Sequence, residues 1–301
     1  MHRPRFGAHM SIAGEPANAL RLGHDIGCDA IQIFTRSPNR WQSPPLTAPQ
    51  VDEFLELREQ TAIDPVVAHS AYLINLATPN DELWLRSIDA AVDEMQRCHR
   101  LGVRDYIIHP GAHTGSGELV GLNRIARGLD AVLSATAESG VRILLETTSG
   151  AGTHLGYRFE QLAWLIEHTE FKDRLGVCLD TAHIFGAGYR ISDRSSYRSM
   201  WSEFGAIIGL DRLGVIHLND SKKEWGSRGD RHEHLGEGLI GITAFHMLVN
   251  DPRLAHVPMI LETPKSKDLA DDVRNLALLH SLVEGNEMSD TNGDRDESLS
   301  L

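Results

Sequence analysis

The stretch ILLETTS, residues 143–149, begins with three large apolar residues and continues with an acid and three hydroxyl side chains. Consecutive apolar residues are typical of a strand that is buried on both faces, as in a parallel sheet. Glu146 then falls where such a strand would end. Seven other segments share this design. They are FGAHMSI (6–12), AIQIFT (30–35), VVAHSAY (66–72), YIIHPG (106–111), GVCLDTAH (176–183), GVIHLND (214–220) and PMILETP (258–264).

Helical patterns separate these eight segments. EPANALRLGHDIG (15–27), ELWLRSIDAAVDEMQRCHRLG (82–102) and LNRIARGLDAVLSATAESG (122–140) place apolar residues three and four positions apart and close on a glycine. Strands and helices that alternate eight times predict an α/β fold, a (β/α)8 TIM barrel with its active site at the C-terminal ends of the strands. We predict one barrel domain over residues 1–284 and a disordered acidic tail over 285–301, where apolar residues are few.

Composition limits the remaining classes. No run of about eighteen apolar residues occurs, and the first residues lack the order of a signal peptide, so we expect a cytoplasmic protein that does not contact membranes. Cys28, Cys98 and Cys178 are scattered without a C-x-x-C pair, which argues against disulfides and a thiolate zinc site. The net charge of −13 would by itself argue against nucleic-acid binding. Bound divalent cations could make the charge positive locally, where a phosphate would bind.

Potential metal ligands lie at or just beyond the ends of the predicted strands. A single histidine such as His9 at a strand end is most often structural. The repetition changes this interpretation, because the C-terminal ends of all barrel strands meet at one mouth. Burial of so many acids and imidazoles would reduce the free energy of unfolding by several kcal/mol per group, unless metal ions or mutual pairing compensate. The candidate ligands are His69, His109, Glu146, Asp180, His183, His217, Asp230, His232 and Glu262.

The ligand types favour zinc. Imidazole nitrogen and carboxylate oxygen both bind Zn²⁺ at about 2.0 to 2.2 Å, usually with three protein ligands per catalytic ion. Nine candidates are enough for three ions. Magnesium and calcium prefer an all-oxygen shell, so five imidazoles argue against them. In the loop GDRHEHLGEG (229–238), Asp230 and His232 are two positions apart and would point to the same side of an extended chain.

Several motifs together resemble one known family. They are GAHMS near the N-terminus, HSAYLINLA, HPGAH, LLETTSGAG, CLDTAHIFGAGY, IHLNDSK, GSRGDRHEHLGEG and ILETP, which ends at residue 264. On these motifs, in this order, the chain is similar to the endonuclease IV family of zinc-dependent apurinic/apyrimidinic (AP) endonucleases.

The resemblance implies a centre of three zinc ions. His69, His109 and Glu146 would bind the first ion. The second ion would share Glu146 as a bridge and add Asp180, His217 and Glu262. The third would be bound by His183, Asp230 and His232. We expect His9 and His113 to lie just outside these ligands.

The resemblance also implies an activity. The protein would be a DNA repair endonuclease that hydrolyses the phosphodiester 5′ to abasic sites in duplex DNA and leaves 3′-hydroxyl and 5′-deoxyribose phosphate ends. Removal of blocking groups from 3′ ends would use the same pocket. Zinc can lower the pKa of bound water from about 15.7 to about 7, which makes hydroxide available at neutral pH. Glu146 would orient this nucleophile and accept its proton, and we expect the protein to act as a monomer.

Two loops have residues suited to filling the gap in damaged DNA. RSPNRWQSPP (36–45) offers Arg36, Arg40 and Trp41 for phosphate contacts and stacking, and AYLINL (71–76) offers Tyr72 and Leu73. Trp41 could equally pack against the prolines of its own loop. Family members often have an arginine two residues before the tryptophan, as a wedge into the minor groove. Here that position is Asn39, so Arg40 is the alternative wedge.

Two other functions would also fit a barrel with metals. The first is a metal-dependent sugar isomerase of the xylose-isomerase-like class, which would contain one or two magnesium or manganese ions. The second is a non-catalytic, zinc-containing binder of damaged DNA. Metal content separates the first from the endonuclease, and hydrolysis of an abasic oligonucleotide separates the second.

Overall fold

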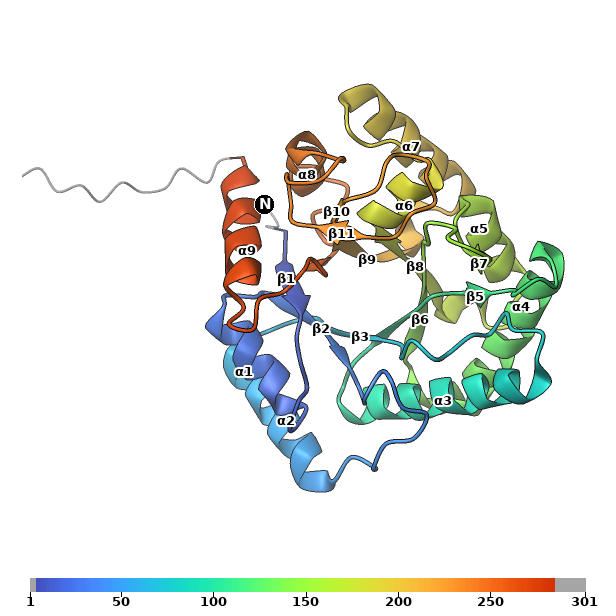
Figure 1. Cartoon of the computed structure of the whole chain (residues 1–301). Coiled ribbons are helices and arrows are strands. Elements are labelled where there is room, and N and C mark those ends of the chain that lie inside the picture. The colour runs from blue at the N-terminus through green and yellow to red at the C-terminus, as the bar shows by residue number, and fades with distance from the viewer. Residues whose placement is uncertain (1–3, 285–301) are drawn as a thin grey trace, which may run out of the picture.

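A closed barrel of eight parallel strands forms the centre of the protein (Figure 1), as the computed structural model of residues 4–284 shows. Around the barrel the strand order is β1-β12-β9-β8-β6-β4-β3-β2, so the predicted TIM barrel is confirmed, with all eight expected segments as its strands. The predicted tail, 285–301, lies outside the described residues. The strands are β1 (Phe6–His9), β2 (Ala30–Phe34), β3 (Val66–His69), β4 (Asp105–Ile108), β6 (Arg142–Glu146), β8 (Leu175–Asp180), β9 (Leu213–Leu218) and β12 (Met259–Leu261).

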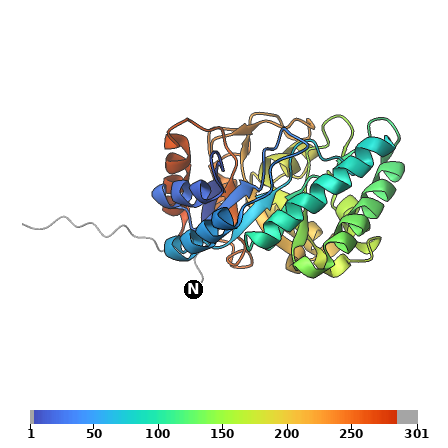
Figure 2. The same cartoon turned by 90° about the horizontal axis from the view of Figure 1, so that it is seen from below.

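Helices surround the barrel, and those from α1 to α4, coloured blue to green, cross its outer surface in Figure 2. They are α1 (Ala17–Asp25), α2 (Ala48–Thr61), α3 (Asp81–Arg100), α4 (Glu118–Ala135), α5 (Phe159–Glu167), α6 (Thr181–Ala187), α7 (Arg194–Ile207), α8 (Ile242–Val249) and α9 (Ala270–Leu282). Short 3₁₀ turns span Ala137–Ser139, Lys172–Arg174 and Leu210–Arg212. Barrel strands and α-helices alternate except at one place in the described residues, where both α6 and α7 lie between β8 and β9.

The protein has two apolar layers, one inside the barrel and one between the barrel and the helices. Seven strands contribute one residue each to the inner layer: Ala30, Val67, Ile107, Leu144, Cys178, Val215 and Ile260. The eighth strand has Gly7 there, because a Cβ at Gly7 would lie 1.6 Å from the carbonyl oxygen of Ala30. These small and branched side chains fill the barrel as a packed core.

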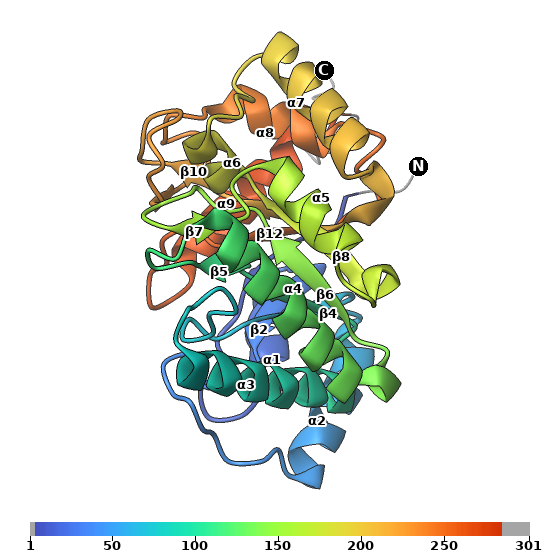
Figure 3. The same cartoon turned by 90° about the vertical axis from the view of Figure 1, so that its right-hand side faces the viewer.

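Two short two-stranded antiparallel sheets extend the loops on one side of the barrel. β5 (Gly111–Ala112) pairs with β7 (His154–Leu155), and β10 (Asp220–Ser221) pairs with β11 (His232–Glu233), both antiparallel. Figure 3 shows β5, β7 and β10 together at the left of the molecule. Within residues 4–284, no helix combines the length and apolar character needed to cross a membrane.

Candidate metal centre

Eight side chains form a ring above the apolar layer inside the barrel. Successive side chains of a strand point to opposite faces, so a residue two positions after an interior residue also points inward, one layer closer to the C-terminal end. The inner residues are Gly7 and the seven of the apolar layer, and the ring residues two positions later are His9, Gln32, His69, His109, Glu146, Asp180, His217 and Glu262. The parallel registers therefore bring together residues that are up to 253 positions apart in the sequence, from His9 to Glu262.

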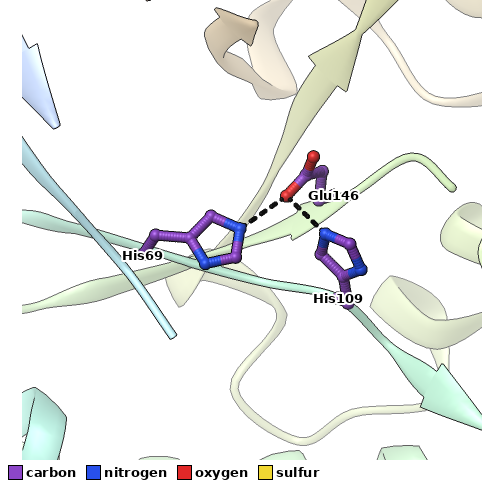
Figure 4. A group of neighbouring side chains, drawn as sticks. All are labelled: His69, His109 and Glu146. Carbon is purple, nitrogen blue, oxygen red and sulfur yellow. Dashed lines mark hydrogen bonds and ion pairs between the residues drawn. The ribbon is translucent and has the colours of Figure 1, made fainter. Parts of the chain in front are cut away.

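The first group of potential ligands consists of His69, His109 and Glu146 (Figure 4). The Oε2 atom of Glu146 lies 3.0 Å from His69 Nε2 and 3.2 Å from His109 Nε2. Glu146 is completely buried. The three side chains come from the ends of the adjacent strands β3, β4 and β6, so the register of the sheet sets their separation.

The second group consists of Glu146, Asp180, His217 and Glu262, and shares Glu146 with the first. His217 Nδ1 lies 3.1 Å from Glu146 Oε1 and 3.2 Å from Glu262 Oε2. Asp180 and His217 are register partners on β8 and β9. The side chain of Asn219, which the sequence analysis did not single out, donates to Asp180 Oδ2 at 2.7 Å and accepts the backbone N–H of Glu262 at 2.9 Å.

The third group lies where β8 passes into α6 and at the start of β11. Asp180 caps α6, since its Oδ1 accepts the backbone N–H of His183 at 2.8 Å, and this places His183 on the first helical turn. The atoms of Asp180, His183 and His232 lie within 4.8 Å of one another. Asp230, which the sequence analysis assigned to this group, is 3.3 Å from His183 Nε2 and 3.6 Å from His232 Nε2.

The loop with Asp230 and His232 is fixed by a buried carboxylate. Asp220 accepts the backbone N–H groups of Ser221, Gly236 and Ile240 at 2.8, 3.0 and 2.9 Å. A Cβ at Gly238 would lie 2.5 Å from Asp220 Oδ1, so this close approach requires glycine. The sequence analysis missed the role of Asp220, although it lies in the quoted IHLND segment.

The donor set of these groups fits metal ions. His232 Nε2 is buried without a hydrogen-bond partner, while carboxylate oxygens of Asp180 and Asp230 lie 3.6 Å away. Two ligands that each lie about 2.1 Å from one tetrahedral zinc ion are about 3.4 Å apart. The imidazole and carboxylate atoms in the three groups are separated by 3.0 to 3.6 Å in their closest pairs. Metal binding would also compensate the burial of charged groups.

The imidazoles and carboxylates shift one another's pKa values. Burial opposes ionisation of Glu146, but His109 and His217 outweigh it and lower its pKa well below the usual range. Burial also opposes protonation of His183, yet Asp180 and Asp230 raise its pKa well above the usual range. Burial of Asp230 is likewise outweighed by His183, which holds the pKa of Asp230 at about 2. Without metal ions, the positive charge of protonated histidines such as His183 therefore compensates the negative charge of the carboxylates.

A cavity of about 760 Å³ opens above the centre. Its walls include six of the nine potential ligands and an apolar part that contains Met10, Phe34 and Tyr72. The six are His69, His109, His183, Asp230, His232 and Glu262. Tyr72 is 70% exposed and its ring meets that of Phe34 edge-on at 5.3 Å. Leu73 is partly exposed beside it.

The DNA contact predicted for Arg36 stays a prediction, but the contacts of this side chain give it a structural role. Its side chain is only 1% exposed, and its Nε lies 2.6 Å from the equally buried Glu94. The guanidinium also donates to the carbonyl oxygens of Arg40 and Trp41. Arg36 thus holds its own loop against α3. A buried guanidinium needs a buried carboxylate such as that of Glu94 to compensate its lost hydration.

Trp41 is partly buried against the core, and its stacking on DNA stays a prediction. Its ring contacts the core, and the Arg86 guanidinium lies 4.5 Å from the ring centre. Arg97 and Arg100 of α3 donate to loop carbonyls at Pro44 and Leu46. Asn39 and Arg40 remain exposed at the tip of the loop.

The two histidines predicted just outside the ligands differ. His9 Nδ1 lies 2.9 Å from Gln32 Nε2 and 3.6 Å from Glu262 Oε1, and His9 lines the cavity. His113 instead shapes its own loop, since its Nδ1 accepts the backbone N–H groups of Gly115 and Gly117. The contacts of His113 do not support the predicted place beside the ligands.

Comparisons with known proteins agree with this geometry. The sequence profile of the xylose isomerase-like TIM barrel family matches residues 20–279. The chain is 51% identical over 280 residues to the probable endonuclease 4 of Chloroflexus aggregans, covering 93% of this chain and 98% of that protein. It is 50% identical over 284 residues to the probable endonuclease 4 of Chloroflexus aurantiacus, covering 94% and 100%. The chain belongs to the endonuclease IV family.

A solved structure of the endonuclease IV family has the same fold. The crystal structure of endonuclease IV from Thermus thermophilus matches with a TM-score of 0.81 and 37% sequence identity. The match covers 93% of this chain and 98% of the other. Of the three functions that the sequence left open, family membership favours the endonuclease, and with it a hydrolase that uses metal ions.

For this endonuclease IV family member, we expect metal removal to change the pH dependence of stability. The raised pKa of His183 stabilises the folded metal-free protein fully below about pH 6.5, which is the usual pKa of histidine. This contribution is lost as the pH rises through the raised pKa. The lowered pKa of Glu146 stabilises it above about pH 4.5, and this is lost as the pH falls through the lowered pKa.

The melting temperature of the metal-free protein should therefore be highest between about pH 4.5 and 6.5. Zinc should move the maximum to neutral pH, because ligands must lose their protons to bind it. Thermal melts at a series of pH values, with chelator and with zinc, measure this shift. Identical profiles in both conditions would contradict the coupling between metal and protons.

Proposed function

We propose that this protein is a zinc-dependent DNA repair endonuclease that hydrolyses the phosphodiester 5′ to abasic sites in duplex DNA. The products would be a 3′-hydroxyl and a 5′-deoxyribose phosphate, and blocked 3′ ends would be further substrates. The observation that supports this most is the set of three groups of potential ligands that share Glu146 and Asp180 and have other members in the wall of a cavity. Family membership supplies the reaction class.

Three zinc ions would occupy the ligand groups. His69, His109 and Glu146 would bind the first ion, and Glu146 with Asp180, His217 and Glu262 the second. His183 and His232 would bind the third together with Asp230, and the structure also brings Asp180 close to this group. Bound zinc would supply Lewis acidity toward the phosphate and lower the pKa of water.

Glu146 has the central part in the proposed hydrolysis. Its two oxygens face different groups, Oε2 toward His69 and His109 and Oε1 toward His183 and His217. A carboxylate in this position can orient a water molecule for in-line attack and accept its proton. Complete burial keeps bulk water away, so the electrostatic interactions of the Glu146 carboxylate are stronger than at the surface.

The apolar cavity wall would accept an abasic deoxyribose turned out of the helix. Extrusion costs less where a base is missing, because less stacking and pairing is lost. Tyr72 and Leu73 would fill the space left in the duplex, and Tyr72 has the exposed aromatic ring that stacking requires. Arg40, at the tip of the other loop, would contact phosphate. The size of duplex DNA is compatible with a monomeric enzyme.

Incision of a defined oligonucleotide tests the proposal. A duplex with one abasic site is incubated with the protein, and the ends of the fragments are identified by mass spectrometry. Cleavage on the 5′ side with a 3′-hydroxyl is expected, together with three zinc ions per chain by elemental analysis. An intact duplex, or cleavage that leaves an unsaturated sugar on the 3′ end, would overturn the proposal.

Arg40→Ala should weaken DNA binding mainly through lost charge. A single phosphate contact contributes about 0.9 to the slope of log affinity against log salt, so this slope should fall by about one. Fluorescence anisotropy over a salt series measures it. Arg142→Ala is the matched control, since Arg142 is also exposed but lies at the first position of β6, at the opposite end of the barrel. An unchanged slope in Arg40→Ala would remove Arg40 from the contacts.

A further inference from the structure

Gln32 is the one residue of the ring whose side chain is neither a carboxylate nor an imidazole. It contacts three other residues of the ring. Its Nε2 lies 2.5 Å from Glu262 Oε1 and 2.9 Å from His9 Nδ1, and its Oε1 lies 2.7 Å from His217 Nε2. The side chain is completely buried. Every polar atom of this amide is therefore used within the metal centre.

The partners of Gln32 fix the orientation of its amide. The carboxylate of Glu262 only accepts hydrogen bonds, so the amide nitrogen must face it. The amide oxygen then faces His217 and also only accepts, so His217 Nε2 must carry hydrogen. The other ring nitrogen, Nδ1, consequently points toward Glu146 and Glu262, at 3.1 and 3.2 Å.

Three other histidines of the centre have backbone carbonyls as partners. Nδ1 of His69, His183 and His232 lies 2.8, 2.8 and 3.1 Å from the carbonyl oxygens of Ser70, Thr147 and Glu262. In these three rings Nε2 faces the ligand groups. His217 has the reverse orientation, and the acceptor for its outer N–H is a side chain. Backbone carbonyls cannot be removed by substitution, but Gln32 can.

We propose that Gln32 is a positioning residue of the metal centre. It holds His217 with Nδ1 toward Glu146, and it binds Oε1 of Glu262 so that Oε2 faces the same point. Groups that orient ligands in this way typically change metal affinity by about 10- to 100-fold when they are removed. The inference rests on the proposed function only in its use of metal ions, since DNA takes no part in it.

Gln32→Met tests the proposal, because methionine has similar length but cannot accept from His217 or donate to Glu262. Zinc affinity is measured by competition with a chromophoric chelator. We expect binding at one site to weaken by about 10- to 100-fold, and one zinc ion fewer per chain after dialysis against the chelator. Parental zinc affinity in this variant would overturn the proposal.

Gln161→Met is the matched control. Gln161 is also a buried glutamine, and its amide bonds to Gly156 and Glu118, which are not among the potential ligands. It should retain parental zinc binding. An equal loss of zinc in both variants would show that removal of any buried amide weakens the centre, and would also overturn the specific role of Gln32.

A measurement on the unchanged protein does not depend on the folding of a variant. In the zinc-loaded protein, ¹H–¹⁵N correlation spectra of the histidine rings should show the proton of His217 on Nε2 and metal binding at Nδ1. A proton on Nδ1 would contradict the proposal. Neither measurement uses DNA, so failure to incise abasic duplex would reject the proposed function without changing this result.

Discussion

Glu146→Gln should reduce incision of abasic DNA by about 10³-fold or more, which is ~4 kcal/mol in activation free energy. Glutamine has the same size, but its side chain is uncharged, and its NH₂ group is a donor that replaces one of the two carboxylate oxygens. The variant would lose a shared metal ligand and the group proposed to accept the proton of water. Single-turnover cleavage of an abasic oligonucleotide measures the effect directly.

The fold should survive this substitution, because the barrel strands and both apolar layers are unchanged. Circular dichroism and thermal melts check this. Glu118→Gln is a suitable control, since Glu118 is a partly exposed carboxylate at the start of α4 that pairs with Arg158 and Tyr157. Turnover near that of the parent in Glu146→Gln would reject the central role of Glu146.

Exhaustive metal removal should reduce incision at least as much as Glu146→Gln does, to the background rate. It should also lower stability. An ion at a free concentration about 1,000-fold above its Kd adds about 4 kcal/mol to the free energy of unfolding. For a protein of this size, each lost ion should lower Tm by roughly 8 °C. Incision assays and melts after chelation and dialysis measure both quantities.

Reconstitution distinguishes zinc from harder cations. Zinc should restore both incision and Tm, because imidazole and carboxylate are both good ligands for it. Magnesium should restore neither at the same concentration, since it prefers oxygen ligands and five of the candidate ligands are histidines. Full incision by a protein shown by elemental analysis to be metal-free would end the metal-dependent proposal.

The barrel could be predicted from the sequence because two local periodicities define it. Apolar runs such as ILLE predict buried parallel strands, and apolar residues three and four apart predict the helices. The same reasoning located most of the ring, because acids and histidines inside apolar segments are conspicuous. Gln32 was missed because an amide is not a metal ligand, although it lies two positions after Ala30, as Glu146 lies two after Leu144.

Residue pattern alone was enough to place candidate ligands such as His69, Glu146 and Asp180 at the ends of barrel strands, because strand alternation and parallel packing are local and repeated. Which charged side chains are exposed and which are buried became known only from the folded chain. Arg36 and Arg40 have the same charge and lie in the same loop, yet one pairs with Glu94 of α3 and the other is exposed. That difference depends on a helix residue 58 positions away in the sequence. Contacts between distant segments arise only when the chain has folded, so residue type and spacing could not reveal them.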